Sequence, residues 1–324
     1  PGISTSGLPI DVAVIWNRAG QLSILPVAGE YRQAVALGFV GATDVAVGFV
    51  IRSDYSVEPG AWGPGGFVSY AHSGFGGRIA SGNETFLVGD TYQSAGGQFV
   101  ATLWDAAGKP TIVEGLAGVN SSVRGINADG MYVGITGNSA NPANYARGFI
   151  GRGKDAVRLN FPGFPQARGL DINDSGWFTG YWQMPDQRLR GYVARVDLDT
   201  GAQEIHDLGL FPGTEQTLAQ AINNDGTIVG GAVGGPFGDV VRALIWPNGS
   251  LVPQDLNLFV DLPGVTLIDA YRINNAGQIL AEGLSDSGNY AYYVLTPVPE
   301  PGAIAGGGVV TLALRRRGLV RPAR

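Results

Sequence analysis

Arginines recur at equivalent places in this sequence, and they are the residues best suited to bind a ligand. Arg147, Arg190 and Arg242 each stand just before a recurrent apolar segment. Three more precede a second recurrent phrase at unequal distances, and these are Arg124, Arg168 and Arg272. Guanidinium groups bind carboxylates and sulfates through paired hydrogen bonds, so arginines gathered in a ring would bind an acidic polysaccharide. The alternative is that each arginine pairs with an aspartate of a neighbouring structural unit or caps loop carbonyls.

Two tryptophans, Trp177 and Trp182, fall in or beside segments that the sequence predicts to be loops. An exposed indole in such a place stacks on sugar rings, which would support a polysaccharide ligand. The alternative is that both rings are half buried and serve in packing.

Catalytic chemistry has weak support in the sequence. Four carboxylates, Asp90, Asp171, Asp269 and Glu282, lie near repeated strands and would form an acid and base pair of a glycosidase if two of them converged. The sequence contains no GxSxG nucleophile motif and no phosphate-binding loop, and its two histidines lack the HExxH spacing of a zinc site. It has no cysteine, which excludes thiolate catalysis. We expect a non-enzymatic protein without metal or cofactor, with a polysaccharide lyase or glycoside hydrolase as the alternative.

The elements that must position these residues are repeats. One phrase recurs at Ile126–Gly130, Ile172–Gly176, Ile222–Gly226 and Ile273–Gly277, with starts 46, 50 and 51 residues apart. An apolar strand, an Asn, two small residues and a Gly before a second apolar strand predict a β-hairpin. The expected turn residues are Asn127, Gly130, Asn173, Gly176, Asn223, Gly226, Asn274 and Gly277. Their spacing is not that of a calcium loop.

A second hairpin fills the other half of each period, as in the segments that start at Val12, Phe99 and Arg242. Two hairpins make four short antiparallel strands every 41 to 51 residues, measured between the glycines or alanine that end each second strand. That is the size of one propeller blade. We therefore predict an all-β fold, a β-propeller over residues 1–296 with six blades, or seven as the alternative. Its N-terminal strands would complete the last blade and close the ring.

Composition agrees with this fold and excludes other classes. Glycine makes up 52 of the 324 residues, which is unsuited to a helical bundle because each glycine inside a helix costs about 1 kcal/mol. The net charge of -6 argues against a protein that binds nucleic acid.

The repeated INxxG phrase, followed by an apolar strand that ends in Trp, resembles the HAF family of extracellular repeats. The resemblance covers roughly residues 12–295. The His-Ala-Phe that names the family stands here as Arg-Gly-Phe at Arg147, Arg-Gly-Tyr at Arg190 and Arg-Ala-Leu at Arg242. The resemblance implies a secreted bacterial protein.

The C-terminal segment, residues 297–324, has a second recognisable order. Pro299, Glu300 and Pro301 come first, then an apolar stretch over residues 302–314, then Arg315, Arg316 and Arg317. This order resembles the PEP-CTERM sorting signal. The resemblance implies processing by an exosortase, export through the periplasm of a Gram-negative bacterium to the cell surface or medium, and a link to biofilm and exopolysaccharide. The apolar stretch is shorter than the ~20 residues of a membrane span, so membrane contact would be transient.

Overall fold

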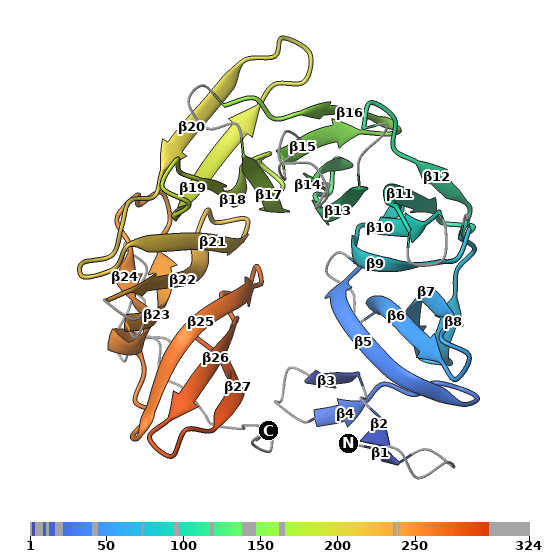
Figure 1. Ribbon diagram of the computed structural model, residues 1–324, viewed down its shortest axis with the longest axis horizontal. Helices are drawn as coiled ribbons and strands as arrows, with labels where there is room; N and C mark the ends of the chain where they lie inside the picture. The colour runs from blue at the N-terminus through green and yellow to red at the C-terminus, as the bar shows by residue number, and fades with distance from the viewer. Residues whose placement is uncertain are drawn as a thin grey trace, which may run out of the picture. The chain divides into compact units, whose positions relative to one another are not determined.

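The computed structural model describes residues 2–3, 9–10, 13–16, 22–40, 45–72, 74–93, 97–116, 120–137, 147–161, 166–235, 238 and 240–297. The chain forms two compact units, Pro1–Phe161 and Pro162–Arg324. Within the described residues, each unit consists of β-strands, and the second also contains a 3-10 helix (Figure 1).

Unit 1 contains three four-stranded antiparallel sheets and two short hairpins. The hairpins are β1 (Gly2–Ile3) with β2 (Pro9–Ile10), and β3 (Val14–Trp16) with β4 (Leu22–Ile24). The first sheet is β5 (Tyr31–Phe39), β6 (Ala46–Arg52), β7 (Val57–Gly63) and β8 (Gly66–Ser69). The second is β9 (Gly76–Gly82), β10 (Phe86–Tyr92), β11 (Phe99–Asp105) and β12 (Pro110–Ile112). Two parallel pairs, Val57 with Gly76 and Val40 with Gly82, link these two sheets, so they form one eight-stranded sheet. The third is β13 (Asn120–Ile126), β14 (Met131–Gly137), β15 (Arg147–Arg152) and β16 (Asp155–Arg158).

Unit 2 contains two four-stranded sheets and one three-stranded sheet, all antiparallel. The first is β17 (Ala167–Ile172), β18 (Phe178–Gln183), β19 (Leu189–Val196) and β20 (Gln203–Asp207). The second is β21 (Gln216–Ile222), β22 (Ile228–Gly234), β23 (Val240–Trp246) and β24 (Gln254–Asp255), followed by the 3-10 helix η2 (Leu256–Phe259). The third is β25 (Val265–Ile273), β26 (Ile279–Ser285) and β27 (Tyr290–Leu295).

The predicted all-β fold is confirmed. Successive four-stranded antiparallel sheets, each built from two hairpins of one sequence period, are the blade architecture of a β-propeller. The described residues form five four-stranded antiparallel sets, two of which join into one eight-stranded sheet, a three-stranded sheet over residues 265–295 and two short hairpins. The number of blades and the closure of a ring concern both units together, and they stay predictions.

The repeated Asn and Gly residues form the turn of the first hairpin in four sheets, β13–β16, β17–β20, β21–β24 and β25–β27. Gly130, Gly176, Gly226 and Gly277 have φ angles between +74° and +79°, a region that favours glycine. The Asn side chain closes each turn from within, because its Oδ1 accepts a hydrogen bond from the backbone N–H four residues later. This bond is 2.9 Å from Thr227 N to Asn223 and 3.0 Å from Trp177 N to Asn173.

The same Asn side chain also joins one sheet to the next. The Nδ2 of Asn173 donates to the backbone oxygen of Asn223 at 3.1 Å, and the Nδ2 of Asn223 donates to that of Asn274 at 3.3 Å. In unit 1, Asn83 donates in the same way to Asn127 at 2.8 Å. Asn173 and Asn223 are each only 3% exposed, so a lost partner would leave a buried polar group unpaired.

The repeated glycine lies within the second strand of its sheet, rather than at its end, and allows a close backbone approach. A Cβ on Gly134, Gly180 or Gly230 would lie within 2.3 Å of a carbonyl oxygen of the first strand of the same sheet. That first strand carries a register shift at this point, which is a β-bulge. In the last sheet Ala281 takes the place of the glycine, and its partner strand β25 carries two register shifts.

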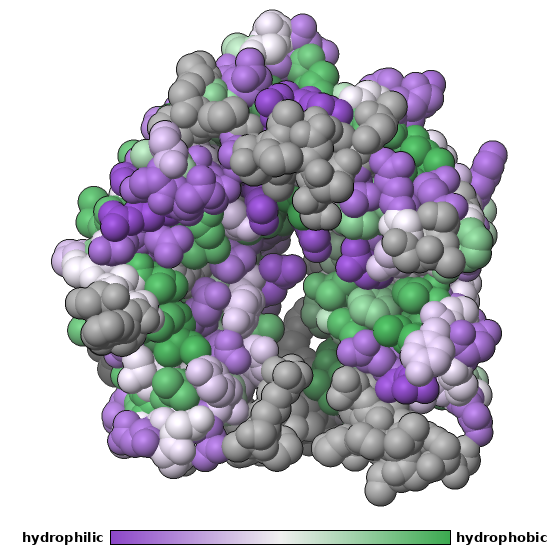
Figure 2. All heavy atoms as spheres, viewed as in Figure 1, coloured by the Kyte–Doolittle hydropathy of each residue, from purple (hydrophilic) through white to green (hydrophobic). Residues whose placement is uncertain are grey.

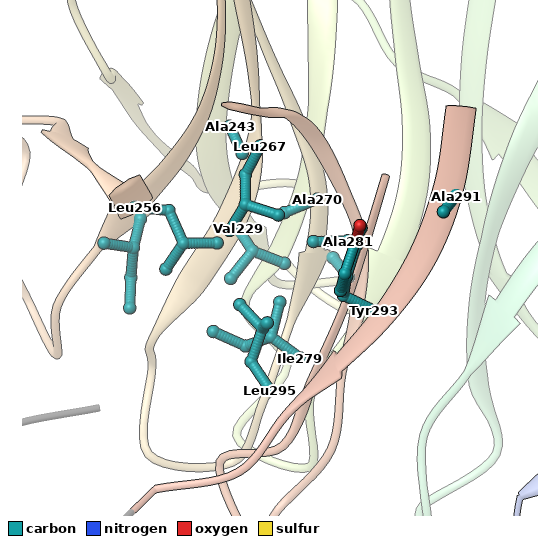
Figure 3. Close-up of a cluster of buried hydrophobic side chains, with 12 residues drawn as sticks. Val229, Ala243, Leu256, Leu267, Ala270, Ile279, Ala281, Ala291, Tyr293 and Leu295 are labelled. Carbon is teal, nitrogen blue, oxygen red and sulfur yellow. The ribbon is translucent and has the colours of Figure 1, made fainter. Parts of the chain in front are cut away.

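Apolar side chains fill the space between successive sheets. In unit 2, Val229, Ala243 and Leu256 of the second sheet and its 3-10 helix pack against Leu267 and Ile279 of the third (Figure 3). Burial of this apolar surface favours folding by about 25 cal/mol per Å². The sheets of each unit are thus held by apolar packing and by the Asn bonds.

We predict that Asn223→Ala destabilises the protein by about 2 to 3 kcal/mol, because a turn bond and a bond between sheets are both lost at a buried site. Urea unfolding of the full chain measures this change. Asn248→Ala is the control, since Asn248 is exposed in another turn and the expected change is below about 0.5 kcal/mol. Equal effects of the two variants would contradict the proposed role of Asn223.

Candidate functional site

Two of the three arginines at the equivalent repeat position form ion pairs within their own sheets. Arg190 Nη2 lies 2.8 Å from Asp207 Oδ2, and Arg242 Nε lies 3.4 Å from Asp255 Oδ2. Each aspartate belongs to the fourth strand of the sheet. Arg147 forms no ion pair within the described residues. It lies in unit 1 and the other two in unit 2, so a ring of all three stays a prediction.

The other three arginines do not share one structural position. Arg124 is the extra residue of the β-bulge in β13. Arg168 lies opposite Tyr181, donates a 2.6 Å hydrogen bond to its hydroxyl group and stacks on its ring at 5.2 Å. Arg272 is exposed and donates from Nη1 to the backbone oxygen of Tyr271.

Arg272 and Asp171 come close together, although they belong to the third and first sheets of unit 2. Burial raises the pKa of the Asp171 carboxyl group, and the positive charge of Arg272 opposes that rise. Asp171 also accepts hydrogen bonds from the backbone N–H groups of Ile172 and Ile222. Sequence spacing alone would not place these two residues together, because 101 positions separate them.

The two tryptophans proposed to bind sugars differ in burial, and both pack against another ring. Trp182 is 2% exposed and stacks on Tyr192, with ring centroids 5.2 Å apart and planes 2° apart. Trp177 is half buried and faces the ring of His206 at 5.7 Å.

A polar cluster that the sequence did not reveal lies in unit 1. Arg78 forms an ion pair with Asp90 at 3.0 Å, and the hydroxyl group of Ser122 in the next sheet donates to Asp90 at 2.7 Å. The Arg78 guanidinium also lies 5.6 Å from the ring centres of both Tyr92 and Phe99. The Asp90 side chain is only 3% exposed, so this cluster links two sheets as a buried charge network.

In the last sheet, two of the carboxylates noted in the sequence face each other. Asp269 in β25 lies directly opposite Glu282 in β26, and the hydroxyl group of Tyr271 donates to Glu282 at 2.7 Å. Burial raises the pKa of Asp269 to about 6, and the charge of Glu282 adds to this rise. A Cβ on Gly231 of the preceding sheet would lie 2.6 Å from Asp269 Oδ1, so the carboxyl group is packed against that sheet.

The remaining predictions concern the sorting signal, metal binding and membrane contact. The sorting residues Pro299, Glu300, Pro301, Arg315, Arg316 and Arg317 lie outside the described residues. Among the residues that are described, no three His, Asp or Glu side chains group closely enough to hold a metal ion. The same part of the chain has no helix long and apolar enough to cross a membrane.

Hydrophilic residues dominate the visible surface over the β19 to β21 region of unit 2 (Figure 2).

The chain resembles two solved structures. TolB from Acinetobacter baumannii is 12% identical with a TM-score of 0.43, and the match covers 75% of this chain and 61% of TolB. Trypanosoma rangeli sialidase in complex with sialic acid is 10% identical with a TM-score of 0.34, and the match covers 88% of this chain and 49% of the sialidase. The chain thus spans about three fifths and one half of those proteins. It matches no family model, and no curated protein matches its sequence.

We predict that Asp269 makes stability depend on pH. An unfolded Asp has a pKa near 3.9, so the folded state binds more protons than the unfolded state between about pH 4 and 6. The stability that Asp269 contributes is therefore present below about pH 4 and is lost as the pH rises through 6. Asp269→Asn should stabilise the protein more at pH 7.5 than at pH 4.5.

Thermal unfolding at the two pH values measures this difference. Asp225→Asn, in an exposed turn, is the matched control and should show no such dependence on pH. An Asp269→Asn variant that shifts Tm equally at both pH values would show that Asp269 does not retain a proton in the folded state.

Proposed function

We propose that this chain is an exported, non-enzymatic binding protein of the cell surface or extracellular matrix of a Gram-negative bacterium. The observation that carries the proposal is the order Pro299-Glu300-Pro301, an apolar stretch and Arg315-Arg316-Arg317 at the C-terminal side of the last sheet. A positively charged end after a short apolar segment favours retention of that end on the cytoplasmic side. An exosortase-type enzyme would then release the folded sheets outside the cytoplasm. The tail contacts the membrane only until that cleavage.

The proposed ligand is an extracellular polysaccharide with acidic groups. Support comes from the arginine side chains, which outnumber lysines 19 to 2 in this sequence. Arginine binds carboxylate and sulfate groups in a bidentate manner, which lysine cannot do. Arg272 supports the proposal in particular, because it is exposed and its hydrogen bond to the backbone oxygen of Tyr271 uses one guanidinium nitrogen.

A second candidate function is a secreted polysaccharide lyase or glycoside hydrolase. It is supported by the facing carboxyl groups of Asp269 and Glu282. A pair in which one carboxyl group keeps its proton up to about pH 6 supplies a general acid beside a charged partner. Tyr271, which donates to Glu282, would hold that partner in place.

The sorting proposal predicts loss of the tail. In a Gram-negative host with an exosortase, the full chain behind a secretion signal should appear outside the cytoplasm with a mass that lacks the residues after the Pro-Glu-Pro. Simultaneous Arg315→Ala, Arg316→Ala and Arg317→Ala should retain the tail. The pair Arg321→Ala and Arg324→Ala is the control with normal processing. A wild-type protein that keeps its full mass would contradict the proposal that the tail is a sorting signal.

The binding proposal predicts retention on acidic polysaccharide that weakens with salt. The full chain should bind alginate or dextran sulfate columns at low salt and elute as salt is raised, with no retention on neutral dextran. Arg272→Ala should elute at lower salt than the wild type. Absence of retention would contradict the binding function, and release of new reducing ends or unsaturated sugars would favour the enzyme.

A further inference from the structure

The repeated sheets provide an internal comparison that isolates one unusual pair of side chains. In both four-stranded sheets of unit 2, the arginine of the third strand pairs with an aspartate of the fourth. These pairs are Arg190 with Asp207 and Arg242 with Asp255. In both sheets the aspartate lies directly opposite the residue two positions after the arginine.

The β13–β16 sheet of unit 1 has an arginine at both places. Arg147 begins the third strand, and the residue directly opposite Phe149 on the fourth strand is Arg158. The position that holds an aspartate in the two sheets of unit 2 therefore holds a second positive charge here.

Backbone bonds confirm that these positions are equivalent. In the β13–β16 sheet, Leu159 N donates to Gly148 O at 2.8 Å. In the β17–β20 sheet, Leu208 N donates to Gly191 O at 3.0 Å. Leu159 directly follows Arg158, and Leu208 directly follows Asp207.

Strand geometry places the two arginine side chains on one face of the sheet. Residues two apart on a strand share a face, and residues directly opposite share it too, so Arg147 and Arg158 are diagonal neighbours. The same diagonal spacing brings Arg190 within 2.8 Å of its aspartate. Arg158 is exposed and Arg147 is half buried, and neither forms an ion pair with an acidic residue within the described part of the chain.

Two guanidinium groups on diagonal neighbours of one sheet face repel each other unless an anion lies between them. The two positive charges are neighbours here although acidic residues outnumber basic ones in the chain and its net charge is -6. Two planar forks of N–H donors on one face match the oxygens of a carboxylate or a sulfate.

We propose that Arg147 and Arg158 form a binding site for an oxyanion, a carboxylate or sulfate group carried by an acidic polysaccharide. The site takes the place that an aspartate side chain fills in the two sheets of unit 2. This inference rests on the proposed function for the identity of the ligand, while the oxyanion chemistry follows from the two arginines alone.

The test places at position 158 the aspartate that the protein already has at the equivalent positions, Asp207 and Asp255. Arg158→Asp recreates the pairing of Arg190 with Asp207, so the variant should fold. Its new aspartate side chain should form an ion pair with Arg147 and neutralise the positive charge there. Arg152→Asp, an equal change of charge at an exposed residue of the neighbouring strand β15, is the matched control. The reverse substitution, Asp207→Arg, should create a second site beside Arg190.

Binding of the full chain is measured by calorimetry with sodium sulfate and sodium glucuronate at constant ionic strength, and by retention on dextran sulfate and alginate. The two salts and the two polymers separate a sulfate from a carboxylate ligand. We expect Arg158→Asp to weaken binding of the preferred anion by about tenfold or more, which corresponds to loss of a charged hydrogen-bond pair. Arg152→Asp should change it less than about twofold, and Asp207→Arg should raise the number of bound anions.

The outcomes separate this inference from the wider proposal. If the wild type binds the small anions, Arg158→Asp abolishes that binding and neither polymer is retained, the result supports the site and contradicts the polysaccharide function. Retention of the polymers that is equal for the wild type and Arg158→Asp overturns the site and leaves the function standing. Absence of any anion binding by the wild type also overturns the site.

Discussion

The bond from one asparagine amide to the backbone of the next asparagine is the interaction on which the order of the sheets depends. Asn173 closes its own turn through Oδ1 and binds the following sheet through Nδ2. A single buried side chain thereby fixes both the hairpin and the position of that hairpin against its neighbour. Apolar contacts, which are not directional, supply most of the stabilising free energy, and the asparagine supplies the register.

The first and second strands of the sheets carry side chains that differ between repeats, and those that face each other are chemically matched. Arg78 meets Asp90, Arg168 meets the hydroxyl group and ring of Tyr181, and Asp269 meets Glu282 at places related by the repeat. The backbone is held by the turns and the close glycine contacts. Polar chemistry can therefore change at these places while the strands keep their pairing, and a surface that binds ligand can arise on such a scaffold.

Hairpins, turns and period could be predicted from the sequence, because they depend on local φ angles and on alternation along a strand. The role of Asn223 was predicted only in part, since its bond to Asn274 joins residues 51 positions apart. The pairing of Arg190 with Asp207 was missed because it requires the register between the third and fourth strands. Trp182 was assigned two roles from the sequence, and burial against Tyr192 favours packing. Contacts such as Asp171 with Arg272 arise only after three sheets are stacked, and no local pattern encodes them.

The bulge residue on the first strand, opposite the repeated glycine or opposite Ala281 in the last sheet, differs in type between sheets. Its side chain leaves the alternating pattern of the strand, so Arg124 and Tyr271 occupy a place that ordinary pairing would not supply.

The asparagine link has a further consequence because its donor and its acceptor belong to the same residue type. Asn223 accepts at its backbone carbonyl group from the sheet before it and donates through its amide to the sheet after it. A whole period that is duplicated or deleted leaves every remaining junction chemically unchanged, whereas a partial period breaks one. Recombination between repeats can thus lengthen or shorten such a chain by complete sheets, and the length of the array is free to change without a new kind of contact.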